Sequence, residues 1–312
     1  MTRLIVTALA LTLTGCATTS GDAQRVSLAA LATPAAATAK ATPTPPARCT
    51  DPTASLRPRS GPIAAGSFMD RIRRRGSLVA GVDQNSLRLA YLRPSTGRIE
   101  GFEVDLVREI ARALFGDPNR IELRAVTTSQ RESMVRSGKV DIVVDAMTIN
   151  CDRRRRVAFS TVYLDAGLRL LVPASSRARS LADLGGRRVC ATAGSTTLQR
   201  IARDPSHPIP YPVAQRTDCL VELQQGRVDA IASDDAILLG FRAQDPNTKL
   251  IGPALEDEPY GMAIDKRHPE FVRYVNAVLE RVRGDGTWRR LHSRWLDDLA
   301  PAATPPAARY ED

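Results

Sequence analysis

Residues 140–161 restrict the possible folds of this chain more than any other stretch. They begin with a short, mostly apolar run at 140–144, which is typical of a buried strand. Small and hydroxyl residues, Ala146 and Thr148, follow the run, and consecutive arginines occupy 153–156. Ligands of open α/β sheets bind beyond the carboxyl ends of strands, and a guanidinium can hold a carboxylate through two hydrogen bonds. The stretch therefore predicts a strand that ends at a site for an anionic group.

A second segment repeats the beginning of this pattern. A Gly-basic-Val-Asp sequence occurs at 138–141 and again at 226–229, and each copy leads into an apolar run that ends in small or polar residues. When the two copies are aligned, Ala146 falls on Asp234. The copy that ends at Ala146 therefore has an arginine nearby, and the copy that ends at Asp234 has a carboxylate. Two such half-sites suit a ligand that carries both charges, as an amino acid does.

Several short motifs occur in order along about residues 76–299. One motif lies within 141–160 and consists of a turn, an acid-Arg pair and a Phe-Ser ending. The others are residues 78–83, 101–106, 184–195 and 226–230, Tyr260 with Gly261, and Trp295. Together they resemble the family 3 bacterial extracellular solute-binding proteins, the polar amino-acid receptors of ABC importers. The resemblance implies an α/β periplasmic-binding-protein (Venus flytrap) fold with two lobes. Each lobe would be a mostly parallel sheet flanked by helices, and a two-strand hinge would join them.

The alternation of strand and helix patterns agrees with an α/β class. Apolar residues of the segment 104–114 fall on one helical face, and so do those of 271–282. We expect lobe 1 to comprise 76–162 plus 256–299, and lobe 2 to comprise 163–255. The discontinuous lobe 1 is implied by the family resemblance.

The amino terminus has the features of a targeting segment. Arg3 precedes an apolar run at 4–13 that is too short to span a bilayer. Leu-Thr-Gly-Cys, which ends at Cys16, resembles the bacterial lipobox. We therefore expect residues 1–15 to be a signal peptide and Cys16 to carry acyl chains such as palmitate. This places the protein at the cell membrane, lipid-anchored on the extracytoplasmic face.

Two segments have compositions that do not favour a packed core. Residues 16–75 begin with a stretch rich in Ala, Thr and Pro, and residues 300–312 contain Pro-Ala-Ala-Thr-Pro-Pro. Segments with few large apolar residues do not bury enough surface to offset the entropy of ordering. We expect the first to be a tether and the second a disordered tail.

The cysteines other than Cys16 form an even set: Cys49, Cys151, Cys190 and Cys219. Outside the cytoplasm an even set indicates disulfides. The four allow three pairings, and the sequence alone does not choose among them. We favour Cys190–Cys219 within lobe 2 and Cys49–Cys151, which would attach the end of the tether to lobe 1. No Cys-x-x-Cys spacing supports a metal site, and we expect neither metal nor cofactor.

The resemblance implies roles for the residues that hold the α-groups of an amino acid. Arg153 would bind the α-carboxylate, with Thr148 beside it at the end of the strand that carries Ala146. From lobe 2, Ser195 and Thr196 precede an apolar helical run, and backbone N–H groups at a helix amino terminus attract anions; a simple helix cap is the alternative for them. Asp234 would bind the α-ammonium group.

A narrower resemblance concerns the side chain of the ligand. Residues 127–131 resemble the Thr-Ser-x-x-Arg segment of glutamate/aspartate-binding members, in which the counterpart of Arg131 faces the distal carboxylate and that of Thr128 lies nearby. Asp83 stands where those receptors often carry a second arginine, and Ser86 is a further pocket candidate. We therefore expect glutamate or aspartate as the ligand, with asparagine and glutamine left open. A surface arginine is the alternative for Arg131.

The charge and motifs of the chain also bear on other possible functions. The net charge of +10 could indicate nucleic acid, but the chain has no nucleic-acid motif. An enzyme on the same scaffold, such as a relative of cyclohexadienyl dehydratase, would need an acid or base in the cleft, and we expect no catalysis. The partners expected are a small amino acid and an ABC transporter permease, and the protein is expected to be a monomer. A lipoprotein that reports amino-acid status to a membrane sensor is the main alternative, because both functions use the same closed lobe surface.

Overall fold

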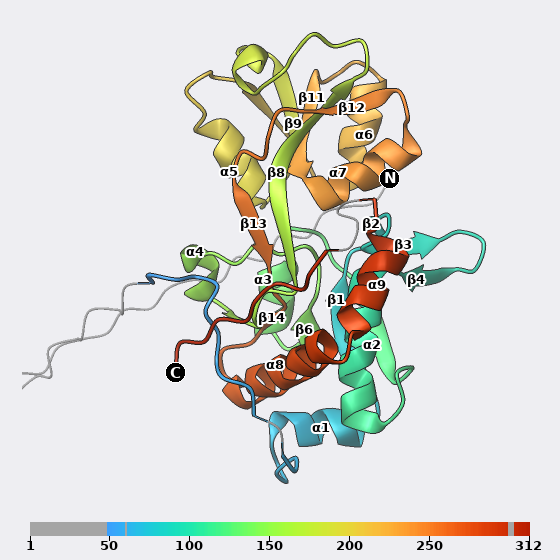
Figure 1. Ribbon diagram of the computed structural model, residues 1–312, viewed down its shortest axis with the longest axis vertical. Helices are drawn as coiled ribbons and strands as arrows, with labels where there is room; N and C mark the ends of the chain where they lie inside the picture. The colour runs from blue at the N-terminus through green and yellow to red at the C-terminus, as the bar shows by residue number, and fades with distance from the viewer. Residues whose placement is uncertain (1–48, 60, 299–302) are drawn as a thin grey trace, which may run out of the picture. The chain divides into compact units, whose positions relative to one another are not determined.

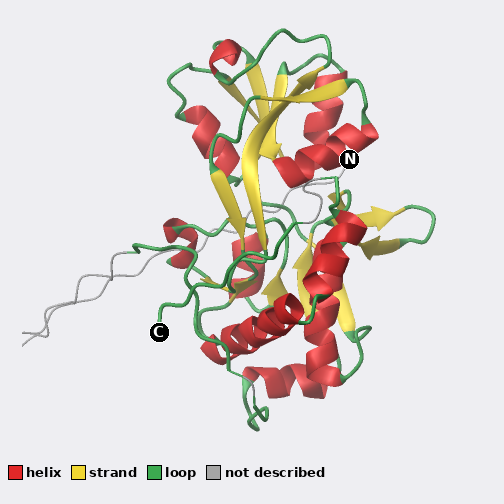
Figure 2. Cartoon of the chain, in the orientation of Figure 1, coloured by secondary structure: helices red, strands yellow, loops and turns green. Residues whose placement is uncertain are grey.

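The structure is a computed structural model that describes residues 49–59, 61–298 and 303–312. The predicted signal peptide, Cys16 and the first part of the predicted tether lie outside these residues. Figure 1 labels the helices and strands, and Figure 2 distinguishes helix from strand along the same view.

The first of two large sheets has the strand order β5-β1-β6-β14-β7. Its strands are β1 (Leu78–Val82), β5 (Ile121–Ala125), β6 (Ile142–Val143), β7 (Ala158–Phe159) and β14 (Ala263–Ile264). The strand β1 pairs in parallel with β5 and β6, whereas β14 runs antiparallel to β6 and β7. Its helices are α1 (Phe68–Arg75), α2 (Phe102–Phe115), α3 (Arg131–Arg136), α4 (Cys151–Arg154), α8 (Pro269–Gly284) and α9 (Thr287–Trp295). A small antiparallel sheet contains β2 (Asn85–Ser86), β3 (Ala90–Arg93) and β4 (Arg98–Glu100).

The second large sheet has the order β10-β9-β11-β8-β12. Its strands are β8 (Leu164–Pro173), β9 (Arg188–Thr192), β10 (Ile209–Val213), β11 (Ala230–Asp234) and β12 (Thr248–Ile251). The strand β9 pairs in parallel with β10 and β11, and β8 runs antiparallel to β11 and β12. Its helices are α5 (Thr196–Ala202), α6 (Arg216–Gln224) and α7 (Asp235–Gln244), and the short 3₁₀ helix η1 spans Ala182–Leu184.

Two strands lead from one sheet to the other. The long strand β8 pairs antiparallel with β13 (Asp257–Tyr260), and the two run side by side in Figure 1. Two α/β sheets, each with a parallel centre extended by antiparallel strands, confirm the predicted fold class.

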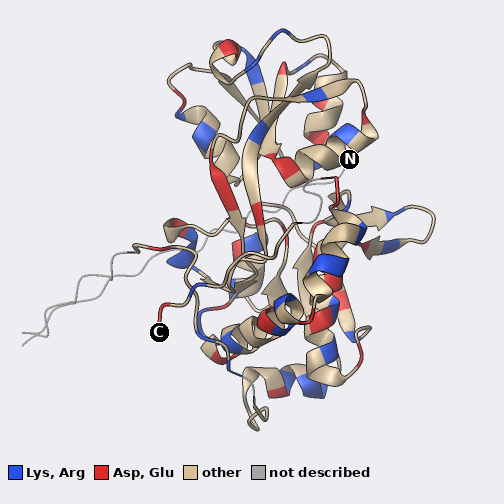
Figure 3. Ribbon diagram, viewed as in Figure 1, with Lys and Arg blue, Asp and Glu red and all other residues tan. Residues whose placement is uncertain are grey.

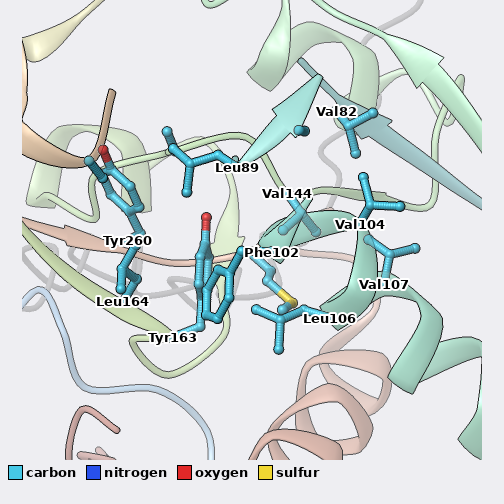
Figure 4. Packing of buried hydrophobic residues seen from close by; sticks show 14 of the residues in the cluster. Val82, Leu89, Phe102, Val104, Leu106, Val107, Val144, Tyr163, Leu164 and Tyr260 are labelled. Carbon is cyan, nitrogen blue, oxygen red and sulfur yellow. The ribbon is translucent and has the colours of Figure 1, made fainter. Parts of the chain in front are cut away.

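Side-chain patterns explain why these elements form. Every residue of β1 is buried, as a strand covered on both faces requires. The helix α2 buries the face expected from its 3.6-residue periodicity, which includes Val104, Val107 and Leu114. In Figure 4, Val104 and Val107 lie near Val82, and Phe102 packs beside Tyr163. Burial of one amphipathic face therefore fixes α2 against β1.

The predicted tether and tail differ from the structure in their described parts. Ser55 and Tyr310 form a parallel β-bridge, and the Ser55 hydroxyl donates a hydrogen bond of 2.7 Å to the carbonyl of Phe159. The amide of Asn276 donates to the Ser55 oxygen at 2.9 Å. Each segment supplies backbone partners for the other, which a composition argument applied to each separately does not consider. The predicted tether also contains α1, which begins after an N-cap formed by Ser67.

Two disulfides are present, with the pairing favoured from the sequence. Cys190 on β9 bonds to Cys219 on α6, and Cys49 bonds to Cys151 at the start of α4. The second bond attaches the beginning of the described chain to the short helix that carries Arg153.

Candidate functional site

A small cavity lies at the carboxyl ends of β6, β9 and β11, where ligands of α/β sheets bind. Its volume is about 20 Å³. Residues from both sheets contribute to its wall: Thr128, Arg131, Ala146, Thr148, Thr192, Ser195, Thr196, Thr197, Arg216, Ala232, Ser233, Asp234 and Ile237. The structure thus brings together most of the residues that the sequence placed in the ligand site.

Arg131 is held at the wall of the cavity by backbone carbonyls. Its Nε donates to the carbonyl of Thr128 at 3.0 Å, and its Nη1 donates to the carbonyls of Asp145 at 2.9 Å and Ala146 at 3.0 Å. Only 3% of Arg131 is exposed, and this burial lowers the pKa of its guanidinium. The alternative of a surface arginine therefore does not describe Arg131.

Ala146 adopts a backbone conformation that is rare for residues with a side chain. Its φ of 41° lies in the left-handed region. The conformation is supported from both sides, because its N–H donates to Glu103 Oε1 at 2.7 Å and its carbonyl accepts from Arg131. Strained residues of this kind concentrate at functional sites. The strain lies at the strand end that the sequence predicts as a binding site.

Arg153 lies directly behind Thr148. Its Nη1 donates to the carbonyl of Thr148 at 2.7 Å, and its Nη2 lies 3.5 Å from the carbonyl of Gly194, which belongs to the other sheet's loop. The helix α4 positions Arg153 through Asn150, whose side chain accepts from the Arg153 N–H at 2.8 Å. Burial lowers the pKa of Arg153 to about 9. Arg153 borders the cavity through Thr148 and is not among the residues that line it.

Ser195 and Thr196 play different roles in the loop before α5. The Ser195 hydroxyl caps the helix: it accepts from the N–H of Leu198 at 3.0 Å and donates to the carbonyl of Thr192 at 2.7 Å. The capping alternative therefore describes the Ser195 side chain. The Thr196 hydroxyl instead faces Thr148, with 3.4 Å between the two oxygens.

Asp234 ends β11 on the opposite side of the cavity. The hydroxyl of Tyr260 donates to its Oδ2 at 2.5 Å. Burial raises the pKa of Asp234, and the hydrogen bond from Tyr260 opposes that rise. Asp235 begins α7.

Glu258 is a residue of this region that the sequence did not single out. It lies on β13, which carries acidic side chains (red in Figure 3). Its carboxylate accepts a hydrogen bond from the Thr148 hydroxyl and another, at 3.2 Å, from the Thr196 hydroxyl. Burial, followed by the negative charge of Asp234, raises the pKa of Glu258 to about 7.

Arg216 at the start of α6 is the second residue that the sequence did not single out. Its Nη1 lies 2.7 Å from Asp83 Oδ2, 2.6 Å from Asp145 Oδ1 and 3.1 Å from the Ser86 hydroxyl oxygen. All four residues are buried. Burial would lower the pKa of Arg216, but the charges of Asp145 and Asp83 raise it well above its usual value.

This cluster corrects the expectation for Asp83 and Ser86. Within the described chain, neither is among the residues that line the cavity. The ion-pair partner of Asp83 is Arg216. Burial would raise the pKa of Asp83, yet the charge of Arg216 and the hydrogen bonds bring it below its usual value. A partner more than a hundred residues away is not visible in the local sequence pattern.

Comparison with known proteins assigns the family. The family model for bacterial extracellular solute-binding proteins, family 3, matches residues 78–298. The chain belongs to this family. It is 33% identical over 222 residues to the glutamine-binding protein of an ABC transporter from Bacillus subtilis, an alignment that covers 71% of this chain and 81% of that protein. It is 26% identical over 252 residues to a glutamate/aspartate import solute-binding protein of Salmonella typhimurium, covering 77% and 83% of the two chains.

Solved structures of amino-acid-binding proteins have the same fold. An ancestral arginine-binding protein bound to glutamine matches with a TM-score of 0.67 and 30% identity, covering 71% of this chain and 98% of that one. Holo ArgBP from T. maritima matches with a TM-score of 0.65 and 29% identity, covering 72% and 98% of the chains. The family relatives thus include proteins named for different amino acids.

Proposed function

We propose that this family member reversibly binds a polar amino acid between lobe 1 (76–162 plus 256–299) and lobe 2 (163–255), and delivers it to an ABC importer. One observation carries the proposal. Two hydroxyl donors for a carboxylate, Thr148 and Thr196, line one small cavity with Asp234, and Arg153 lies next to them through its hydrogen bond to the Thr148 carbonyl. A cavity with an anion-binding side and a cation-binding side suits the two α-groups of an amino acid.

The proposed binding requires movement, because an amino acid is larger than a cavity of about 20 Å³. The paired strands β8 and β13 form the two crossings between the lobes, and two crossings of this kind act as a hinge in binding proteins. The lobes would separate to admit the ligand and close again around it. The named relatives are solute-binding proteins, which supports a function without catalysis.

The distal group of the ligand would face Arg131 and Thr128, which line the same cavity. A buried guanidinium is costly without a close counter-charge, and the carboxylate of Asp145 lies 4.0 Å from Arg131 Nε. A ligand with a second carboxylate would supply a further counter-charge, and a ligand amide would satisfy the guanidinium in part through its carbonyl oxygen. The names of the relatives, which include glutamine and glutamate/aspartate, support both classes of ligand.

We also propose that the protein is anchored to the outer face of the cell membrane through acyl chains on Cys16. The lipobox-like Leu-Thr-Gly-Cys sequence supports this anchor. Among the described residues, no helix is both long and apolar enough to cross a membrane.

Titration calorimetry with a panel of amino acids tests the proposed specificity. Wild-type protein is expected to bind glutamate and aspartate most tightly, with glutamine and asparagine weaker by about 1–2 kcal/mol, the difference between a charged and a neutral hydrogen bond. Arg131→Gln should close this gap and leave the α-group contacts in place. Arg136→Gln, at an exposed position of the same helix, is the matched control and should leave the gap unchanged. Preferred binding of lysine, arginine or leucine by the wild type would contradict the assignment.

A further inference from the structure

The donors assigned to the ligand's α-carboxylate already bind a carboxylate of the chain itself. The hydroxyls of Thr148 and Thr196, one from each side of the cavity, both donate to Glu258. We propose that Glu258 is an internal competitor for the carboxylate site, and that an incoming amino acid binds only as Glu258 takes up a proton. This inference rests on the proposed function and adds to it a residue that sets the affinity and its pH dependence.

The position of Glu258 on β13 limits its escape to solvent. The residue is 1% exposed. The strand around it is held to lobe 1, because the N–H of Ile149 donates to the carbonyl of Pro259 at 2.8 Å and Thr148 forms an antiparallel bridge with Tyr260. The strand β13 is also paired with β8 along its length. In this arrangement Glu258 stays at the site, and protonation is the simpler way to remove its charge.

The charged groups around Glu258 favour proton uptake. The negative charge of Asp234 raises the pKa of Glu258, and the positive charge of Arg153 lowers it. The charge of Arg153 is shared between Glu258 and Glu132, because its Nε lies 4.0 Å from Glu132 Oε1. The neighbouring Tyr260 is a neutral phenol whose hydroxyl donates to Asp234, away from Glu258. A second carboxylate, brought by the ligand, therefore enters a site that is already negative on one side.

The direction of the pH dependence follows from the burial of Glu258. Burial and Asp234 raise the pKa of Glu258 to about 7, and the hydrogen bonds from Thr148 and Thr196 oppose that rise. A ligand carboxylate that takes these two donors removes the opposing hydrogen bonds and places a negative charge beside Glu258, which outweighs the ligand ammonium at Asp234 and keeps Glu258 protonated. Above about pH 7 the free protein carries ionised Glu258, so each binding event takes one proton from solvent. Affinity should then fall by up to about tenfold per pH unit. Below about pH 7, Glu258 is protonated before binding, and its contribution to the pH dependence disappears.

The test is calorimetry of the full protein with L-glutamine, whose side chain does not titrate, between about pH 6 and about pH 8. At the upper pH, titrations in buffers of different ionisation enthalpy should show an uptake approaching one proton per ligand. Glu258→Gln mimics the protonated acid, so it should bind about tenfold more tightly than wild type near pH 8 and take up no proton. Asp257→Asn changes an exposed carboxylate on the same strand and should behave as wild type.

The outcomes separate this inference from the function on which it rests. L-glutamine binding by wild type without proton uptake, or equal pH profiles for wild type and Glu258→Gln, would overturn the role of Glu258 and leave amino-acid binding intact. The proton count in wild type needs no mutation, so it decides the question even where Glu258→Gln does not fold. Absence of binding by every amino acid at every pH would overturn both proposals.

Discussion

Arg216→Leu is expected to lower the free energy of unfolding by about 3–5 kcal/mol, the cost of removing one partner from a buried ion pair. The substitution leaves the carboxylates of Asp83 and Asp145 buried without their shared cation. Asp145 is completely buried, and among the described residues its Oδ2 has no hydrogen-bond partner, with Arg131 Nε 4.0 Å away. Urea unfolding, followed by circular dichroism, measures the loss.

Two further variants control this prediction. Arg227→Leu removes an exposed arginine that pairs with Glu222, and a surface pair of this kind contributes at most about 1 kcal/mol. Adding Asp83→Asn to Arg216→Leu should recover part of the stability, because it removes the charge of one of the two carboxylates that lose Arg216. If Arg216→Leu is as stable as Arg227→Leu, the buried cluster is not a major source of stability.

Arg153→Ala is expected to weaken the binding of every amino-acid ligand by at least about tenfold, because hydrogen bonds to charged groups contribute about 1.5–3 kcal/mol each. Asp234→Asn should do the same through the α-ammonium group. The loss should be similar for glutamate and glutamine, since both ligands share these α-groups. Calorimetry on the two ligands measures it.

The neighbouring Arg155 provides a matched control for Arg153. It lies two residues along the chain, and its exposed guanidinium pairs with Asp152. Arg155→Ala should bind both ligands as the wild type does. Unchanged affinity in both Arg153→Ala and Asp234→Asn would reject the assigned α-group contacts.

Local sequence patterns predicted the parts of the fold that depend on local physics. The all-apolar run at β1 is buried, and the face of α2 follows its periodicity. The similarity of 138–146 and 226–234 placed Ala146 and Asp234 at equivalent strand ends, and both line the cavity. Strand ends are predictable because consecutive residues determine both the burial of a strand and the polarity of the segment that follows it.

Residues whose roles depend on distant partners were not predictable in this way. Arg216 follows Gln215 at a helix start and has no motif of its own, yet its partners come from the other sheet. Glu258 lies among acidic neighbours in the sequence, and only burial against Thr148 and Thr196 distinguishes it. The described tail was misjudged for the same reason, because Tyr310 pairs with Ser55, far away in sequence. Long-range pairing decided each case.

The central claim is that one site holds both charged α-groups of an amino acid. Its most direct test is calorimetry of the wild-type protein with L-glutamine and with two derivatives, the N-acetyl form and the α-amide, each of which lacks one α-charge. We expect that L-glutamine binds and that each derivative binds at least about tenfold more weakly, because Asp234 or Arg153 is then left without its charged partner. Binding of either derivative as tight as that of L-glutamine would contradict it.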